Sequence, residues 1–168
     1  MSQPVETGQL SSDRLEQAWP LIREIAGESS LENWRSFAEA MLAPVNPDTF
    51  RRGILIAERK RTIRGLVTYE TLADLSCGRL LLLRNAVVMD LALAGPIARA
   101  LYRRSLAVAE DATCEGLCVE VTPQMAWIGD IWSREASEAG GLPVTVVSVR
   151  SPLAVSIQSD KIVSVNAG

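Results

Sequence analysis

The sequence predicts an α/β fold: a mixed, twisted central sheet of six to seven strands with helices on both faces. The predicted element order is β-α-α-β-β-β-α-β-α-β, and a run of strands followed by β-α-β-α-β is typical of a mixed sheet. The 168 residues suffice for one core. We therefore expect one domain over residues 1–168, with residues 1–4 and about 152–168 loosely held.

Composition narrows the classes of function. The net charge is −3, whereas a nucleic-acid-binding domain normally presents a basic face. The dense basic cluster Arg59-Lys60-Arg61 reads as a hairpin turn, with a phosphate-binding patch as the alternative. No apolar run approaches the ~18 residues of a membrane span, and no N-terminal signal is recognisable. We expect a cytoplasmic protein that binds neither nucleic acid nor membrane.

Cysteine and histidine content argues against metal and several nucleophilic chemistries. Cys77, Cys114 and Cys118 lack the spacing of metal ligands, and the chain contains no histidine. Ser-His-Asp and Cys-His catalysis are therefore excluded. We expect free thiols and no metal.

The N-terminal part predicts one short strand and two helices. After a strand over 5–10, Ser12 begins a helix that ends at Gly27, and Pro20 should kink it or break it in two. A second helix follows Ser29. One face of this helix carries residues that recur at helical spacing: Trp34, Phe37, Ala38 and Met41. The two aromatic side chains are expected in the core, with stacking on a ligand as the alternative.

A hairpin then leads into the middle of the sheet. Strands are predicted over 53–58 and 63–75, and Gly65 indicates a bulge or a close approach. The following strand, 80–89, is apolar without alternation at Leu80–Leu83 and Ala86–Met89, as expected of a strand covered on both faces.

The stretch 79–121 organises the rest of the chain. The strand over 80–89 is followed by a loop (90–95), a helix (96–111) and a second buried strand (116–121). A loop that opens a helix N-terminus after a strand can hold an anion. The two strands should be parallel neighbours joined by a right-handed crossover.

The C-terminal part predicts a helix and a strand. Thr122-Pro123 begins a helix that ends at Gly140. Its sheet-facing residues are expected to be Trp127, Ile128, Ile131 and Ala136. Strand 144–149 follows, and 161–165 is one more strand or a mobile tail.

This order of elements, with the motif in the loop, resembles the GNAT superfamily of N-acyltransferases over nearly the whole chain. In that family a strand ending in Val is followed by Arg/Gln-x-x-Gly-x-Gly/Ala, whose amides hold the CoA pyrophosphate. Val88 and Ala98 match this pattern, whereas Leu93 stands in place of Arg or Gln and Pro96 in place of the first Gly.

A second signature, Asn-x-x-Ala-x-x-Leu/Phe-Tyr, falls on residues 125–132 at the same spacing. Met125 replaces the Asn. Trp132 replaces the Tyr that often protonates the leaving thiolate.

The resemblance implies transfer of an acyl group from acetyl-CoA or another acyl-CoA to the amine of a small molecule or protein. An acyl-carrier protein is an alternative donor, because its phosphopantetheine has only one phosphate. A backbone N–H near Val88 or Met89 would polarise the thioester. The residues expected to bind the co-substrate are Val88, Met89, Gly95, Ile97, Ala98 and Arg99, and dimerisation stays open.

Glu120, on the strand after the helix, is the first candidate for the general base, and Glu70 is the second. Apolar neighbours would raise the pKa of Glu120 toward that of a base, while an ordinary paired carboxylate is the alternative. No acid occupies the family's position, since Tyr69 and Tyr102 lie elsewhere in the sequence and Cys118 is expected in the core. Two other hypotheses remain: a non-catalytic GNAT-like binding or regulatory module with a decayed CoA site, and an unrelated α/β fold.

Overall fold

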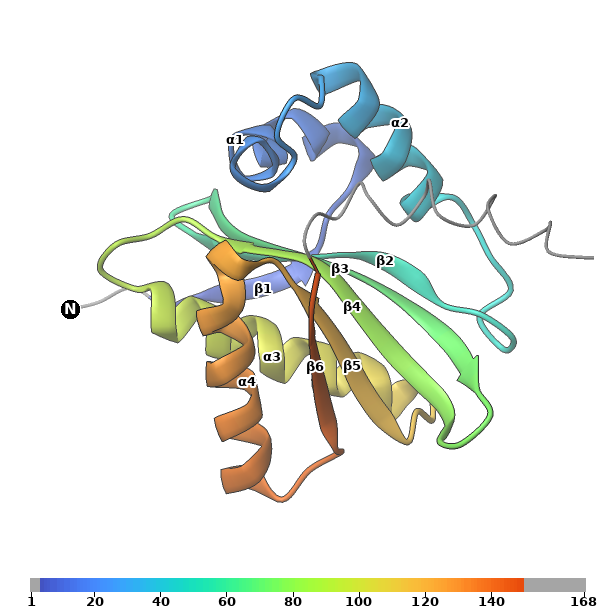
Figure 1. The fold of residues 1–168 in the computed structure, drawn as a ribbon. Coiled ribbons are helices and arrows are strands. Elements are labelled where there is room, and N and C mark those ends of the chain that lie inside the picture. Colours follow the sequence, from blue (N-terminus) through green and yellow to red (C-terminus); the bar gives the residue numbers. More distant parts are fainter. Residues whose placement is uncertain (1–3, 150–168) are drawn as a thin grey trace, which may run out of the picture.

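The computed structural model describes residues 4–149, in which six strands form one sheet in the order β1-β2-β3-β4-β5-β6 (Figure 1). The elements are β1 (Glu6–Gln9), α1 (Leu15–Ile25), α2 (Leu31–Leu42), β2 (Arg52–Arg59), β3 (Thr62–Asp74), β4 (Gly78–Val88), α3 (Ala94–Asp111), β5 (Gly116–Val121), α4 (Ala126–Ala139) and β6 (Val144–Ser148). The further strand predicted over 161–165 lies outside the described residues, as does the C-terminal segment that we expected to be loose. Within the described part of the chain, no helix is both long and apolar enough to span a bilayer.

The sheet is mixed, as predicted. Strands β1 to β4 run antiparallel to their neighbours, whereas β4, β5 and β6 are parallel. The expected pairing of the two strands around α3 is confirmed, with Leu80 opposite Gly116 and Leu83 opposite Val119. Helix α3 is the crossover between them.

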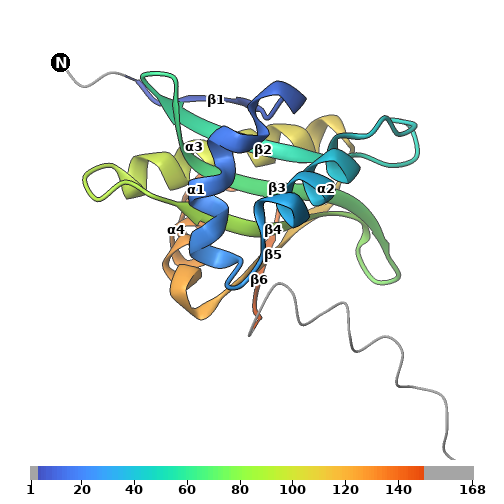
Figure 2. The same cartoon turned by 90° about the horizontal axis from the view of Figure 1, so that it is seen from above.

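Helices cover both faces of the sheet. Helices α1 and α2 lie on one face, and α3 and α4 lie on the other (Figures 1 and 2). Each face buries its own hydrophobic cluster: Ile54, Ile56 and Val87 point toward α1 and α2, while Leu83 and Val119 point toward α3 and α4. Because side chains alternate along a strand, this assignment also fixes which face each polar residue of the sheet occupies.

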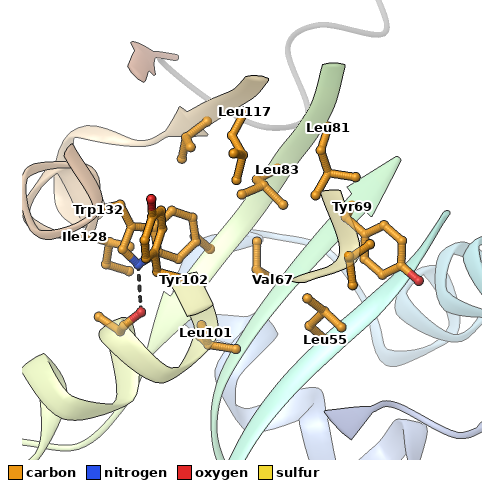
Figure 3. Close-up of a cluster of buried hydrophobic side chains, with 14 of the residues drawn as sticks. Leu55, Val67, Tyr69, Leu81, Leu83, Leu101, Tyr102, Leu117, Ile128 and Trp132 are labelled. Atoms are coloured by element: carbon orange, nitrogen blue, oxygen red, sulfur yellow. Dashed lines mark hydrogen bonds between the residues drawn. The ribbon is translucent and has the colours of Figure 1, made fainter. Parts of the chain in front are cut away.

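Trp132 joins α4 to α3 in the second cluster (Figure 3). Its side chain is fully buried, and its indole N–H donates a 2.7 Å hydrogen bond to the Ala98 carbonyl. The residues predicted to face the sheet do contact this cluster, with Ile128 fully buried and Trp127, Ile131 and Ala136 partly buried against it, but the prediction omits Trp132. The indole at position 132 is therefore a structural element of the core.

Gly65 lies where α3 approaches β3 most closely. A Cβ at this position would stand 2.7 Å from Ile97 Cγ2 and 3.0 Å from Leu101 Cδ1. The pairing of β2 with β3 also shifts by one residue beside it, since Ala57 faces Gly65 and Glu58 faces Ile63. Both predicted reasons for a glycine, close approach and an adjacent bulge, are thus present.

The first two helices depart from the sequence expectation in three respects. Helix α1 runs unbroken through Pro20, so of the two predicted effects, a kink or a break in two, the break does not occur. Ser30, not Ser29, caps α2, and its hydroxyl accepts a hydrogen bond from the Asn33 N–H. Phe37, expected in the core with Trp34, is 41% exposed.

Candidate functional site

Strand β4 separates from β5 halfway along its length. The parallel pairing ends at Leu83 and Val119, although β4 continues to Val88. A bulge follows immediately: Thr68 of β3 faces Arg84, but Leu66 faces Val87, so β4 carries an extra residue. Asn85 lies in this bulge with φ 53°, a left-handed conformation that Asn tolerates better than most residues. Its amide donates to Thr68 Oγ1 at 3.1 Å.

The bulge sets the direction of the backbone amides near the end of β4. Gly65 and Val88 face each other, and the Met89 N–H donates to the Arg64 carbonyl at 2.8 Å. In an antiparallel ladder this pattern makes Gly65–Val88 a non-hydrogen-bonded pair, so the Val88 N–H points away from β3. Of the two amides considered for a thioester carbonyl, the one on Met89 is already bonded and the one on Val88 faces the β5 side.

The two candidate carboxylates meet at one arginine. Arg84 on β4 lies between Glu70 on β3 and Glu120 on β5, with Nη1 3.2 Å from Glu70 Oε1 and Nε 2.9 Å from Glu120 Oε2. All three side chains lie on the α1/α2 face and are partly exposed. Arg84 Nε is close enough to Glu120 for an ion pair, but its N–H direction does not satisfy hydrogen-bond geometry. The apolar surroundings expected for Glu120 are replaced by a guanidinium.

The loop before α3 binds its own carboxylate. Asp90 Oδ1 accepts hydrogen bonds from the backbone N–H of Ala92 at 3.0 Å and of Leu93 at 2.9 Å. Helix α3 begins at Ala94, two residues earlier than predicted, and its first internal bond runs from the Ile97 N–H to the Leu93 carbonyl. Because Pro96 has no N–H, only the amides of Ala94 and Gly95 remain available at this helix start.

The predicted cofactor residues differ in what they present to solvent. Ile97 and Ala98 are fully buried against the sheet, so their side chains are not available to a ligand. Arg99 is partly exposed and folds back over the helix start, since Nη1 lies 3.5 Å from the Cβ position of Gly95. Its Nε donates to Glu135 of α4 at 2.9 Å, and Arg103 lies 3.6 Å from the other oxygen of that carboxylate.

A cavity of about 440 Å³ lies between the end of α1, the start of α2 and the bulge of β4. Its walls are mainly apolar, and its polar groups include Asn33 and Asn85. The apolar lining comes from Ile22, Ile25, Ala26, Trp34 and Phe37. The exposed ring of Phe37 thus borders the same cavity as Asn85, which connects the α1/α2 face to the bulge.

Of the groups considered as acids, the two tyrosine side chains are buried and Cys118 is partly buried. The Tyr102 hydroxyl is buried without a hydrogen-bond partner, and burial raises the pKa of Tyr102. Tyr69 lies on the α3 face of β3, away from Glu120, and burial raises its pKa as well. Burial, with a smaller contribution from Glu120, raises the pKa of Cys118.

Comparisons with solved structures identify the fold. No protein-family model and no curated sequence matches the chain. The aminoglycoside N-acetyltransferase AAC(6')-Iy, in complex with a CoA-based bisubstrate analogue, superposes with a TM-score of 0.64 at 14% identity, covering 83% of this chain and 91% of that one. This chain has the GNAT fold.

The fold is shared by solved proteins that are described as having different roles. A transcriptional regulator from Bacillus halodurans C-125 superposes with a TM-score of 0.62 at 13% identity, covering 77% of this chain and 90% of that one. An acetyltransferase from Trypanosoma brucei gives 0.54 at 13% identity, covering 72% and 85%. The GNAT fold expected from the sequence is confirmed, and at these identities the likeness concerns the fold alone.

Three features of the site were missed in the sequence. Arg84 interrupts the apolar run of β4, and a charge in a central strand is a signal for an ion pair. Asn85 follows it, and Asn is one of the non-glycine residues that are enriched at positive φ. Asp90 precedes the two amides that it binds by two and three residues, the spacing of an Asx turn.

Proposed function

We propose that this protein transfers an acyl group from a thioester donor to an amine. The observation that carries the proposal is the end of the β4–β5 pairing at Leu83, followed by the bulge at Asn85, after which the Val88 N–H has no β3 partner. An unpaired amide beside a strand opening is suited to polarise a thioester carbonyl. Glu120 lies on β5 beside the same opening, directly after the last residue of β5 that pairs with β4, and its side chain is on the α1/α2 face.

Glu120 is proposed to accept the proton of the attacking amine, with Glu70 as the second candidate. Neither carboxylate accepts a hydrogen bond from another described side chain, although both lie beside Arg84. Their lone pairs are therefore open to a substrate ammonium group. Arg84 holds both carboxylates on the α1/α2 face, where the apolar cavity at Asn85 would receive the body of the amine.

The donor is proposed to bind through the pantetheine arm more than through its phosphates. The residues assigned to it are Val88, Gly95 and Arg99, with the backbone near Met89, Ile97 and Ala98 forming the adjoining wall. Asp90 occupies two loop amides and Pro96 removes a third donor. We therefore expect weak binding of acetyl-CoA and other acyl-CoA thioesters. An acyl-carrier protein, with a single phosphate on its prosthetic group, would lose less binding affinity than acyl-CoA from the missing phosphate contacts.

The test is acyl transfer by the purified full chain. Acetyl-CoA, octanoyl-CoA and an acylated phosphopantetheine are each incubated with a panel of aliphatic and aromatic amines, and the amide is quantified by mass spectrometry. Glu120→Gln should reduce the rate by roughly 100-fold or more, because it removes the proton acceptor. Glu110→Gln, at an exposed position of α3, is the matched control and should leave the rate unchanged.

A non-catalytic binding module is the second candidate, favoured by two observations. The helix start already holds an internal carboxylate, and the buried Trp132 has no acidic proton to donate. A folded wild-type chain that forms no amide with any of the three donors would favour this module over the enzyme. In that case melting experiments with the same thioesters would show whether the opening binds them at all.

A further inference from the structure

The cavity of about 440 Å³ at the β4 bulge has an aromatic wall. Trp34 is 3% exposed, and its indole N–H donates a 2.8 Å hydrogen bond to the Leu15 carbonyl, which holds the ring in place. Phe37, one turn further along α2, packs beside it with 6.1 Å between the ring centres and 31° between the ring planes. Because Phe37 is 41% exposed, part of this aromatic surface is open to a ligand that enters the cavity.

The remaining apolar lining comes from α1 and its end. Ile22, Ile25 and Ala26 border the cavity and belong to the hydrophobic packing of the α1/α2 face. The volume of the cavity is in the lower part of the range for small-molecule sites. Its size and lining therefore suit one compact apolar group, such as a single ring, better than a hydroxylated or extended group.

The charges around the cavity favour a cation. Among the described residues that line it, Glu28 alone is charged, and it forms no ion pair within residues 4–149. On the sheet, Glu70 and Glu120 share the single guanidinium of Arg84, which leaves a net charge of −1 on that group. Both places attract an ammonium group and repel a carboxylate or a phosphate.

Asn85 supplies a hydrogen-bond acceptor where the cavity meets the sheet. It is the one strand residue among the described lining residues. Its Nδ2 donates to Thr68 Oγ1 at 3.1 Å, and no residue within 4–149 donates a hydrogen bond to its Oδ1. An ammonium group bound to this oxygen is on the face of the sheet that carries Glu120.

On the basis of the acyl transfer proposed above, we propose that the acceptor is a small arylalkylamine: a primary amine joined by a short chain to one aromatic ring, without a carboxylate or phosphate. The ring packs on Trp34 and Phe37, where aromatic groups gain from offset or edge-to-face contacts. The ammonium group donates to Asn85 Oδ1. After the nitrogen loses one proton to Glu120, it attacks the thioester carbonyl. The C–N bond forms, the C–S bond breaks, and a second nitrogen proton ends on the departing sulfur.

Isothermal titration of the full chain, with and without CoA, tests the acceptor class with four probes. 2-Phenylethylamine carries both the ring and the ammonium group. L-Phenylalanine adds a carboxylate, 2-phenylethanol lacks the charge, and ethylamine lacks the ring. 2-Phenylethylamine should bind at one site and about tenfold or more tightly than each of the other three.

Two matched pairs of variants locate the binding. Phe37→Ala should weaken 2-phenylethylamine binding about threefold to tenfold, whereas Phe50→Ala, at a ring outside this cavity, should change it less than about twofold. Glu28→Gln should reduce the discrimination against L-phenylalanine severalfold. Glu24→Gln, at an exposed residue of α1 that does not line the cavity, should leave that discrimination unchanged. Thermal melting followed by circular dichroism checks that each variant is folded.

The outcomes separate the acceptor class from the reaction. Affinity for 2-phenylethanol or L-phenylalanine equal to that for 2-phenylethylamine would overturn the assignment of a cationic ligand. Equal effects of the two phenylalanine substitutions would overturn the location, and absence of saturable binding both with and without CoA would overturn the class. Saturable binding without amide formation from acetyl-CoA would overturn the proposed function while confirming the ligand of the cavity. Faster amide formation with ethylamine at equal concentration would overturn the acceptor class alone.

Discussion

Replacing Asp90 by alanine should strengthen the binding of CoA. In the wild-type chain the Asp90 carboxylate accepts both the Ala92 and the Leu93 N–H, directly before the start of α3. Removing it frees two amides for a pyrophosphate and takes away a like charge next to it. The substitution is therefore expected to strengthen CoA binding through the freed N–H groups of Ala92 and Leu93.

The magnitude follows from the number of hydrogen bonds exchanged. Two amide bonds to a charged phosphate, at roughly 1.5 kcal/mol each, contribute about 3 kcal/mol. Loss of the turn that Asp90 stabilises costs about 1 kcal/mol, by analogy with a helix cap. The net gain of about 2 kcal/mol corresponds to roughly 30-fold tighter binding.

Titration calorimetry with CoA on wild type, Asp90→Ala and Asp90→Asn separates the contribution of the freed amides from that of the lost negative charge. Asparagine removes the charge but keeps an oxygen that accepts from both amides, so its gain should be well below that of alanine. A folded Asp90→Ala protein that binds CoA no better than wild type would refute the reasoning, because the loop amides would then not limit binding. Equal gains from both variants would assign the whole effect to charge.

Three further predictions concern the body of the protein. Gly65→Ala should destabilise the fold by about 1–3 kcal/mol, because its Cβ would stand 2.7 Å from the buried Ile97 side chain. The control Gly8→Ala, with no atom within 4 Å of its Cβ, should change the denaturation midpoint little. Burial raises the pKa of Tyr69 and Tyr102 above the ordinary value of 10.0, so the folded chain keeps protons that the unfolded chain loses. Stability should therefore be fully present below pH 10 and fall as pH rises beyond it, and tyrosinate absorbance that developed at pH 10 in the native protein would contradict this. Of the three thiols, the exposed Cys77 should react first with a disulfide reagent, while Cys114 and Cys118, whose pKa values burial raises, should react slowly; mass spectrometry of the labelled peptides identifies the order.

The arrangement of the sheet was largely predictable, because hydrophobic patterning reports burial. The uninterrupted apolar runs of β4 placed it in the sheet centre, and the strand-helix-strand order required a parallel crossover through α3. Patterning was less informative about helices. Trp127 and Trp132 both lie in the predicted helix α4, and only packing against α3 decides that the second one is enclosed. Pro20 is likewise a weak guide, since α1 continues through it although proline removes an interior N–H donor and packing of the helix against the sheet outweighs that loss.

The candidate site was less predictable than the sheet, because its geometry depends on contacts distant in sequence. Glu70 and Glu120 were identified as separate carboxylates, and only the folded sheet brings both to Arg84. Arg99 was assigned to phosphate from its place in the first turns of α3, but Glu135, on a helix that begins 27 residues later in the sequence, competes for its guanidinium. The spacing of residues along the sequence does not reveal ion-pair partners that come from distant elements.

The contact of Arg84 with two carboxylates has a consequence for how the sequence can vary. Arg84 links three strands at the position where the bulge interrupts their backbone pairing, so its loss would leave two negative charges facing each other. Positions 70, 84 and 120 should therefore change together among relatives: an uncharged residue at 84 is expected with no more than one carboxylate at the other two. The same dependence would constrain engineering of this face, since a substitution at any one of the three positions requires a choice at the others.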